Sequence, residues 1–128
     1  MSLTNEVALV TGASRGIGQA IAAALGSKGA TVIGTATSEK GAQAITETFA
    51  ASGITGTGKV LNVTDPESID ALMTSVQAEF GAPTILVNNA GITRDNLLMR
   101  MKDDEWNDVI NTNLTSTFRM SKACLRGM

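Results

Sequence analysis

The sequence of 128 residues contains no histidine, no tyrosine and only one cysteine, and these absences exclude several classes of chemistry. Without histidine, the chain lacks the base of a Ser-His or Cys-His nucleophile pair and the commonest zinc ligand. A single cysteine excludes an intrachain disulfide framework and a zinc site built from several cysteines. We therefore expect no metal site in this chain.

Charge and apolar runs argue against two further classes. Ten Lys and Arg residues and twelve Asp and Glu residues leave a net charge of −2, with no basic block, so binding to nucleic acid through bulk charge is not expected. No apolar run reaches the roughly 18 residues that span a bilayer. The first residues also lack the basic segment and cleavage pattern of a secretory signal. These features favour a cytoplasmic protein without a membrane partner.

Short apolar runs alternate with stretches of helical periodicity, and this alternation predicts an α/β fold. Apolar residues make up 43% of the chain but aromatic residues only 3%, so the core must be aliphatic. Strands separated by helices favour right-handed βαβ crossovers. We expect a Rossmann-like, doubly wound parallel sheet in one domain over residues 1–128, stopping after a fourth helix. The expected strands cover 7–10, 31–36, 59–61 and 84–87, and the expected helices cover 15–28, 38–51 and 65–80, with a fourth from 103.

Helical spacing also predicts which residues of each helix pack against the sheet. Ser38 is suited to cap the second helix, Thr64 or Asp65 is suited to cap the third, and Pro66 suits a first helical position. Cys124 is expected in the core rather than as a reactive thiol. The spaced residues are Ile17, Ala20, Ile21, Ala24 and Leu25 in the first helix, and Trp106, Val109, Ile110, Leu114, Thr117, Met120, Cys124 and Leu125 in the fourth.

A glycine-rich segment joins the first expected strand to the first expected helix. It reads Thr11-Gly12-Ala13-Ser14-Arg15-Gly16-Ile17-Gly18. Glycine is needed where a chain bends sharply or where its backbone approaches a ligand. The helix start offers unpaired N–H groups and the positive end of a dipole, which suit a phosphate. The segment therefore predicts a pyrophosphate site; the alternative is a tight strand-to-helix turn that binds nothing.

Two motifs together resemble the short-chain dehydrogenase/reductase family. One is the Gly-x-x-x-Gly-x-Gly spacing of the segment above, and the other is Asn88-Asn89-Ala90-Gly91 after the fourth strand. With strand order 3-2-1-4, both turns lie at the topological switch point, where a dinucleotide binds. Asn62-Val63 is a third match, at the family's adenine contact; the alternative for Asn62 is an ordinary turn residue. The resemblance implies that the cofactor is held by Gly12, Ser14, Arg15, Gly16, Ile17, Gly18, Thr37, Asn62, Val63, Asn89, Ala90 and Gly91.

The residues that follow the second strand favour NADP(H) over NAD(H). An NAD site usually places an acidic residue there to bind the ribose hydroxyls, but residues 34–38 contain none. Arg15 can pair with a 2′-phosphate, and the Thr37 hydroxyl can donate to it. Both positions match those used by NADP-dependent members of the family. The alternative for Arg15 is a solvated loop charge.

Asn113 lies within the apolar stripe of the fourth helix. A buried amide without partners costs roughly 1–3 kcal/mol, so we expect it to be hydrogen-bonded. Spacing alone favours a core asparagine satisfied by neighbouring backbone. The resemblance instead implies a catalytic role, because Thr112-Asn113-Leu114 matches the family's asparagine that helps to hold the active-site lysine and a water in a proton relay. Met99 and Met101 are candidates for an acyl pocket, although filling gaps is the commoner role of methionine.

Longer stretches narrow the resemblance to the bacterial 3-oxoacyl-[acyl-carrier-protein] reductases. These stretches are residues 33–38, 62–65 and 91–101. The resemblance implies NADPH-dependent reduction of a 3-oxoacyl chain carried by acyl carrier protein, in fatty-acid biosynthesis. It also implies a homotetramer in the cytoplasm.

One departure from these reductases is large. Their remaining catalytic residues are a Ser and a Tyr-x-x-x-Lys pair, which lie beyond the part that this sequence matches, and the sequence has no Tyr. We therefore expect the 128-residue chain alone to be inactive. Two alternatives stay open: a different short-chain dehydrogenase with an alcohol or sugar substrate, and a nucleotide-binding or assembly module without catalysis of its own.

Overall fold

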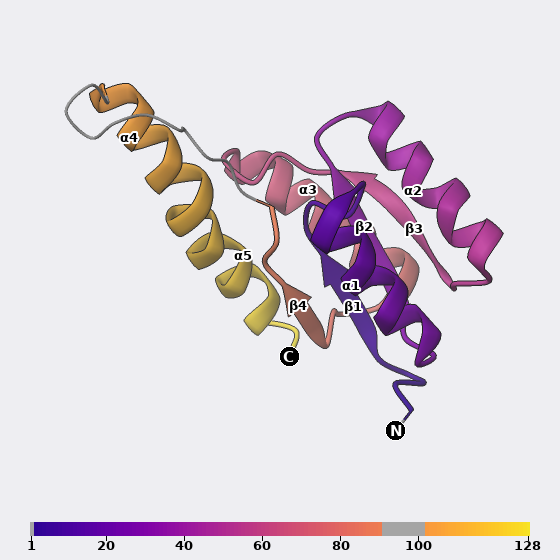
Figure 1. The fold of residues 1–128 in the computed structure, drawn as a ribbon. Coiled ribbons are helices and arrows are strands. Elements are labelled where there is room, and N and C mark those ends of the chain that lie inside the picture. The colour runs from indigo at the N-terminus through magenta and orange to yellow at the C-terminus, as the bar shows by residue number, and fades with distance from the viewer. Residues whose placement is uncertain (1, 91–101) are drawn as a thin grey trace.

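Four parallel strands form one sheet in the computed structural model, which describes residues 2–90 and 102–128. The strands are β1 (Val7–Val10), β2 (Thr31–Ala36), β3 (Gly56–Val60) and β4 (Ile85–Val87). Their order in the sheet is β3-β2-β1-β4 (Figure 1). In the register of the central pairs, Val7 lies opposite Thr31 and Ala8 lies opposite Ile85. The predicted parallel sheet of order 3-2-1-4 is therefore confirmed.

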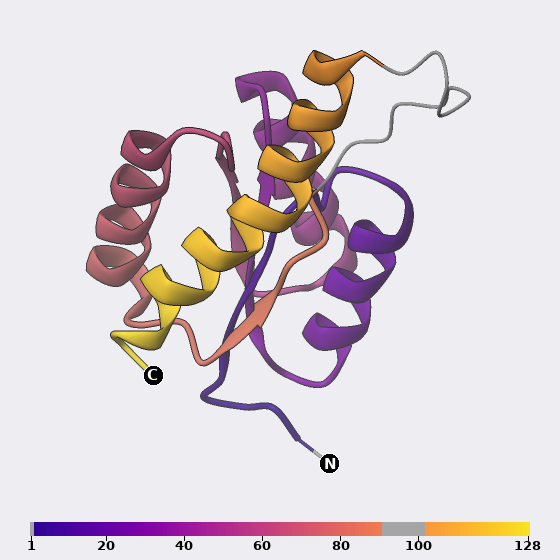
Figure 2. The same ribbon diagram turned by 90° about the vertical axis from the view of Figure 1, so that its left-hand side faces the viewer.

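Helices cover both faces of this sheet. They are α1 (Gly16–Ser27), α2 (Glu39–Ser52), α3 (Pro66–Phe80), α4 (Asp103–Val109) and α5 (Ser116–Leu125), with a π-helical segment, η2 (Ile110–Thr115), between the last two. α1 and α2 pack on one face, while α3 and α5 pack on the other (Figure 2). Right-handed crossovers between parallel strands produce this two-sided cover.

Local sequence signals determine where two of these helices begin. The Ser38 hydroxyl accepts a hydrogen bond from the Gly41 N–H at 3.0 Å, and the Asp65 carboxylate accepts one from the Glu67 N–H at 3.0 Å. Pro66 takes the first position of α3, where its missing N–H costs nothing. The cap predicted at Ser38 is confirmed, and of the two candidates for the third helix, Thr64 and Asp65, the cap is Asp65.

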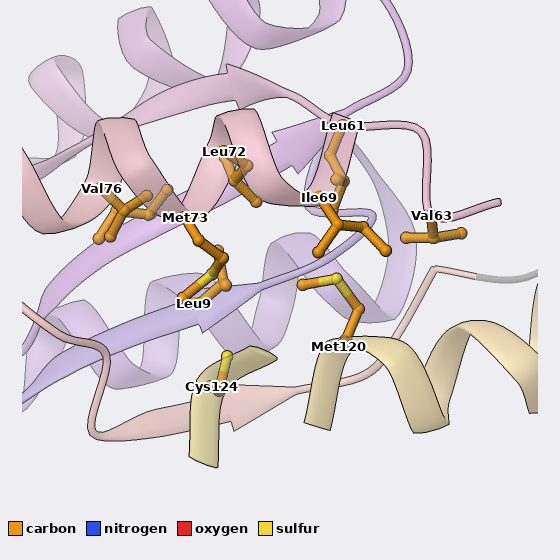
Figure 3. Close-up of a cluster of buried hydrophobic side chains, with 10 residues drawn as sticks. Leu9, Leu61, Val63, Ile69, Leu72, Met73, Val76, Met120 and Cys124 are labelled. Carbon is orange, nitrogen blue, oxygen red and sulfur yellow. The ribbon is translucent and has the colours of Figure 1, made fainter. Parts of the chain in front are cut away.

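Alternation along the strands divides the core into two layers. On β1, Ala8 and Val10 face α1 and α2, whereas Leu9 faces α3 and α5, because successive side chains in a strand point to opposite faces. Cys124 is buried, as predicted. The layer beside α3 and α5 contains Leu9, Ile33, Leu61, Val63, Ile69, Leu72, Met73, Val76, Met120 and Cys124 (Figure 3).

The third strand lies earlier in the chain than its apolar residues suggested. The sequence favoured residues 59–61, but β3 covers Gly56–Val60, and Leu61 follows it. Gly56 and Gly58 have low strand propensity, so the sequence did not indicate a strand there. The packing of the strand nevertheless requires glycine at both positions. A Cβ at Gly56 would collide with the Val32 carbonyl oxygen, and one at Gly58 would collide with the Ala42 carbonyl oxygen. Close approach of neighbouring backbone therefore replaces side-chain packing along this strand.

The fourth helix is interrupted, which the sequence analysis did not anticipate. The Ser116 hydroxyl donates to the Thr112 carbonyl oxygen, and the Thr117 hydroxyl donates to the Asn113 carbonyl oxygen at 2.7 Å. Ser and Thr side chains that bond back to backbone carbonyls distort a helix. The π-helical turn shifts the phase of the apolar stripe, so the predicted stripe is only partly correct. Met120 and Cys124 are buried, but Trp106, Leu114 and Leu125 are 55%, 66% and 67% exposed.

The apolar face predicted for the first helix is also partly wrong. Ile17 is 73% exposed, and Ala20 and Ala24 are exposed as well. The buried positions of α1 are Gly18 and Ala22. Small residues at these positions allow the helix to lie close to the sheet. A search for large apolar residues at helical spacing does not identify a buried glycine such as Gly18.

None of the helices in residues 2–90 and 102–128 combines the length and apolar character that crossing a bilayer requires.

Candidate functional site

Two turns at the carboxyl ends of β1 and β4 are joined by hydrogen bonds. The Thr11 hydroxyl accepts from the N–H groups of Asn89 and Ala90, at 3.0 and 2.9 Å. The Asn89 side-chain amide donates to the Gly12 carbonyl oxygen at 2.9 Å. Thr11 itself is 1% exposed. Segments 77 to 79 residues apart in the sequence therefore meet at one edge of the sheet.

The backbone of the glycine turn depends on its glycines in two different ways. Gly12 and Gly16 have φ angles of 65° and 61°, the left-handed region that glycine adopts without steric cost. Gly18 is needed for space, because a Cβ there would collide with the Gly12 carbonyl oxygen and the Asn89 amide nitrogen. Gly18 is buried beneath the turn and does not line the cleft.

β2 holds the same turn from its other side. The Ala13 N–H donates to the Thr35 carbonyl oxygen at 2.9 Å, and the Gly12 N–H donates to the Thr35 hydroxyl at 3.3 Å. Thr35 is 2% exposed. Its side chain and backbone thus hold two consecutive peptides of the turn.

The first turn of α1 has N–H groups that no side chain of its own helix caps, which suits an anion. Its N-cap residue, Arg15, supplies no side-chain hydrogen bond, and no acidic residue lies in the first turn. By contrast, α2 has Ser38 and Glu39 at this end, and α3 has Asp65 and Glu67. The N–H groups and the positive dipole end of α1 therefore face the cleft without a carboxylate or hydroxyl from their own helix.

A cleft of about 740 Å³ opens above these turns. The glycine turn, the ends of β2 and β3, the residues after β4, and the α4–η2 segment form its walls. A volume of this size is in the range of small-molecule and cofactor sites. The cleft is lined by Gly12, Ser14, Arg15, Gly16, Ile17, Thr35, Ala36, Thr37, Leu61, Asn62, Val63, Thr64, Asn89, Ala90, Asp108, Asn111 and Thr112.

Most of the residues predicted to bind a cofactor share this cleft. The lining includes ten of them: Gly12, Ser14, Arg15, Gly16, Ile17, Thr37, Asn62, Val63, Asn89 and Ala90. Arg15 and Thr37 are both exposed. Gly91, Met99 and Met101 lie outside the described residues.

Asn62 takes part in the turn after β3. Its side-chain oxygen accepts from the Thr64 N–H at 3.0 Å and from the Thr64 hydroxyl at 2.6 Å. This is the ordinary turn role that the sequence left as an alternative. Asn62 nevertheless lines the cleft, so the turn role and a ligand contact are compatible.

Asn113 lies in η2 and is half-buried, but it is not part of the cleft lining. Its carbonyl oxygen accepts from the Thr117 hydroxyl. π-Helical turns are frequent at functional sites, because they displace a side chain from its regular helical position.

Several lining residues were missed by the sequence analysis. Asp108, Asn111 and Thr112 come from the α4–η2 segment. Their i, i+3, i+4 spacing places them on one face of a helix. The sequence analysis considered only the apolar residues of the same segment. Thr35 could not be recognised because a strand threonine carries no motif of its own.

Two pKa shifts arise away from the cleft. A hydrogen bond and the positive charge of Lys59 lower the pKa of Glu79, whose carboxylate lies 2.8 Å from the Lys59 ammonium. Burial raises the pKa of the Cys124 thiol. Neither residue lines the cleft.

The chain is similar to known proteins along nearly its whole length. A profile of the family described as short chain dehydrogenase matches residues 6–128. Three bacterial proteins named 3-oxoacyl-[acyl-carrier-protein] reductase FabG align with all 128 residues: those of Pseudomonas aeruginosa, Vibrio harveyi and Escherichia coli K12, at 65%, 68% and 63% identity. The alignments cover 52%, 51% and 51% of these proteins. The chain therefore spans about half the length of the curated relatives it matches.

Proposed function

Since the chain belongs to the short-chain dehydrogenase family, we propose that it is the NADP-binding part of a 3-oxoacyl-[acyl-carrier-protein] reductase. The observation that carries this proposal is the junction of the two turns: the Asn89 amide bonds to Gly12, and both turns line one cleft. On this proposal, residues 1–128 form the coenzyme-binding domain portion of a longer enzyme of fatty-acid biosynthesis.

The residues at the glycine turn fit a dinucleotide phosphate. Apart from its own helix and chain neighbours, no atom of residues 2–90 and 102–128 lies within 4 Å of a Cβ built on Gly16, so the backbone there has room for a ligand. The uncapped first turn of α1 offers N–H groups to the pyrophosphate. Gly12, Ser14, Gly16 and Ile17 would hold the phosphates, with Gly18 allowing the helix to approach. When bound, the nicotinamide coenzyme supplies a hydride for reduction of the ketone.

Arg15 and Thr37 would select NADP(H) over NAD(H). Both line the cleft beside the end of β2, and residues 34–38 offer no carboxylate to repel a 2′-phosphate. A guanidinium and a hydroxyl are suitable partners for that group. Asn62, Val63, Asn89, Ala90 and Gly91 complete the proposed coenzyme contacts.

Titration with NADPH and NADH tests the coenzyme proposal. We expect the chain to bind NADPH more tightly, and Arg15→Met to weaken NADPH binding by roughly tenfold, as for one charge-assisted hydrogen bond, with NADH binding unchanged. Lys40→Met is a matched control, since Lys40 is exposed near the same strand end but does not line the cleft. Tighter binding of NADH by the unmodified chain would overturn the NADP assignment.

The proposed substrate is a 3-oxoacyl chain on acyl carrier protein. This rests on the 63–68% identity to the three reductases. Asn113 is the proposed catalytic residue of this chain, holding a lysine and a water supplied outside residues 1–128. Because the chain has no tyrosine to protonate the ketone, the 128-residue polypeptide alone should not oxidise NADPH with this substrate.

A chimera tests the substrate proposal directly. In it, residues 1–128 replace the matching half of the Vibrio harveyi reductase. We expect the chimera to oxidise NADPH with a 3-oxoacyl-[acyl-carrier-protein], and Asn113→Ala to lower kcat while the affinity for NADPH stays the same. A folded chimera that binds NADPH but does not turn over would contradict the substrate assignment.

We also infer that the protein acts in the cytoplasm as a homo-oligomer, a tetramer in the complete enzyme. Support comes from the apolar surface left on the α4–α5 side, where Trp106, Leu114, Phe118 and Leu125 are each more than half exposed. Exposed apolar groups on one helical segment favour a protein partner. Light scattering on the chimera, before and after Phe118→Asp, measures the oligomeric state.

A further inference from the structure

Arg119 links two walls of the cleft. It lies on α5 and is half-buried. Its guanidinium donates from Nη1 to the carbonyl oxygen of Thr64, at 3.2 Å and 55 residues away in the sequence. Thr64 lines the cleft, whereas Arg119 does not. Arg119 therefore acts on the cleft through another residue.

The contact continues into the turn after β3. Thr64 donates from both its N–H and its hydroxyl to the Asn62 side-chain oxygen. The Asn62 N–H in turn donates to the Ser68 hydroxyl at 2.9 Å. Asn62 and Thr64 are thus held to each other and to α3, and Arg119 ties the turn to α5 by a hydrogen bond.

Apolar packing beside Arg119 acts on the same turn. Met120, the next residue, is 1% exposed and belongs to the core layer that contains Leu61 and Val63 (Figure 3). Both of those residues also line the cleft. One turn of α5 therefore fixes residues 61–64 through a charged hydrogen bond and a buried methionine.

The other wall of the cleft is built on the same helical segment. η2 precedes α5 directly, and Asn111 and Thr112 of η2 line the cleft. Arg119 therefore joins the turn that carries Asn62 to the helix that continues directly from the segment of Asn111 and Thr112. The hydrogen bond from Arg119 to Thr64 therefore fixes the distance between these two walls.

From these contacts, and resting on the proposed function, we propose that Arg119 is a positioning residue for the adenosine end of the coenzyme. The turn at 61–64 is the proposed adenine wall, and Arg119 fixes it before the coenzyme arrives. Adenosine is common to NADPH and NADH. Arg119 should therefore affect both coenzymes equally, in contrast to Arg15, which is proposed to bind the 2′-phosphate.

The test uses the 128-residue chain with Arg119→Met, which keeps an unbranched apolar stem but removes the donor. We expect roughly tenfold weaker binding of NADPH, NADH and AMP, the scale of one hydrogen bond to a charged group. Hydrogen exchange of the ligand-free chain should become faster at the Asn62–Asp65 amides and stay unchanged in β1 and β2. Arg126→Met is the matched control, since it removes the same charge just after the same helix and should change neither measurement.

A second variant separates the donor from packing and covers a failure of Arg119→Met to fold. Arg119→Lys keeps a charged donor, and its affinities should stay within about threefold of those of the unmodified chain. Affinities as weak in Arg119→Lys as in Arg119→Met would overturn the role of the donor. Unchanged binding and exchange in Arg119→Met would overturn this inference while the proposed function stands. If the unmodified chain binds neither coenzyme nor AMP, the proposed function is overturned, and this inference falls with it.

Discussion

The side-chain amide of Asn89 donates a hydrogen bond to the carbonyl oxygen of Gly12 at 2.9 Å, and so connects the turn after β4 to the turn after β1. The two strands are neighbours in the sheet, but their turns are irregular backbone whose polar groups need partners. Asn89 provides one of them, and Thr11 provides others through its hydroxyl. The cleft therefore depends on side chains that serve the protein's own backbone as well as any ligand.

Asn89→Ala should weaken both stability and coenzyme binding. The substitution leaves the Gly12 carbonyl without this donor, a loss of about 1–2 kcal/mol in the free energy of unfolding. It also frees the glycine turn, so NADPH affinity should fall. Asn88→Ala is the control, because Asn88 belongs to the same motif but is exposed. Urea unfolding and NADPH titration of both variants make the measurement; equal effects of the two substitutions would contradict the role of Asn89.

Thr35→Val should loosen the glycine turn from the β2 side. Valine has nearly the shape of threonine but cannot accept from the Gly12 N–H. We expect the free energy of unfolding to fall by about 1–2 kcal/mol. Because the proposed pyrophosphate site at this turn is common to both coenzymes, binding of NADPH and NADH should weaken by the same factor. Thr31→Val is the control, on a half-buried threonine at the start of the same strand. A change in the ratio of the two affinities would speak against this explanation.

Local signals predicted the alternating strands and helices, and the caps at Ser38 and Asp65 marked two helix starts. The strand order and the meeting of the two turns followed from the resemblance to the short-chain dehydrogenases, together with the carboxyl-end rule for parallel sheets. β3 was misplaced because close backbone contacts, rather than apolar side chains, define it at Gly56 and Gly58.

Two features beside the cleft were not predicted from the sequence: one depends on a long-range contact, and the other on local bonds within a helix. The hydrogen bond from Arg119 to Thr64 joins residues 55 positions apart. A contact of this kind cannot be predicted from a local sequence pattern. The π-helical turn results from side chains that bond back to their own helix at Ser116 and Thr117. Leu114, which lies within this turn, and Trp106, which precedes it, were predicted to be buried but are exposed.

Glu79→Gln should make stability less dependent on pH in the acid range. Lys59 lowers the pKa of the Glu79 carboxylate below its ordinary value. The ion pair therefore stabilises the folded chain fully above the ordinary glutamate pKa, and this contribution is lost as the pH falls through the lowered value. Thermal unfolding between neutral pH and about pH 3 measures it. Relative to the unmodified chain, the variant should be less stable near neutrality and equally stable at the acid limit.

Asp70→Asn serves as the control, because Asp70 is an exposed position on the same helix. If Glu79→Gln lowered the stability by the same amount at every pH, the ion pair would not be the cause.

Cys124 should be chemically inert in the folded chain and should contribute a stability that declines at alkaline pH. The thiol is 1% exposed, and burial raises its pKa. A thiol reagent should therefore label the native chain slowly, at a rate that rises with urea in step with unfolding.

The unfolded thiol of Cys124 ionises at its ordinary pKa, below that of the folded one, so the unfolded state gains stability first as the pH rises. The unmodified chain should lose more stability than Cys124→Ala between neutral pH and about pH 10. Rapid labelling of the native chain would show that the thiol reaches solvent without unfolding. Identical pH dependence of the two proteins would show that folding does not raise the pKa of the thiol.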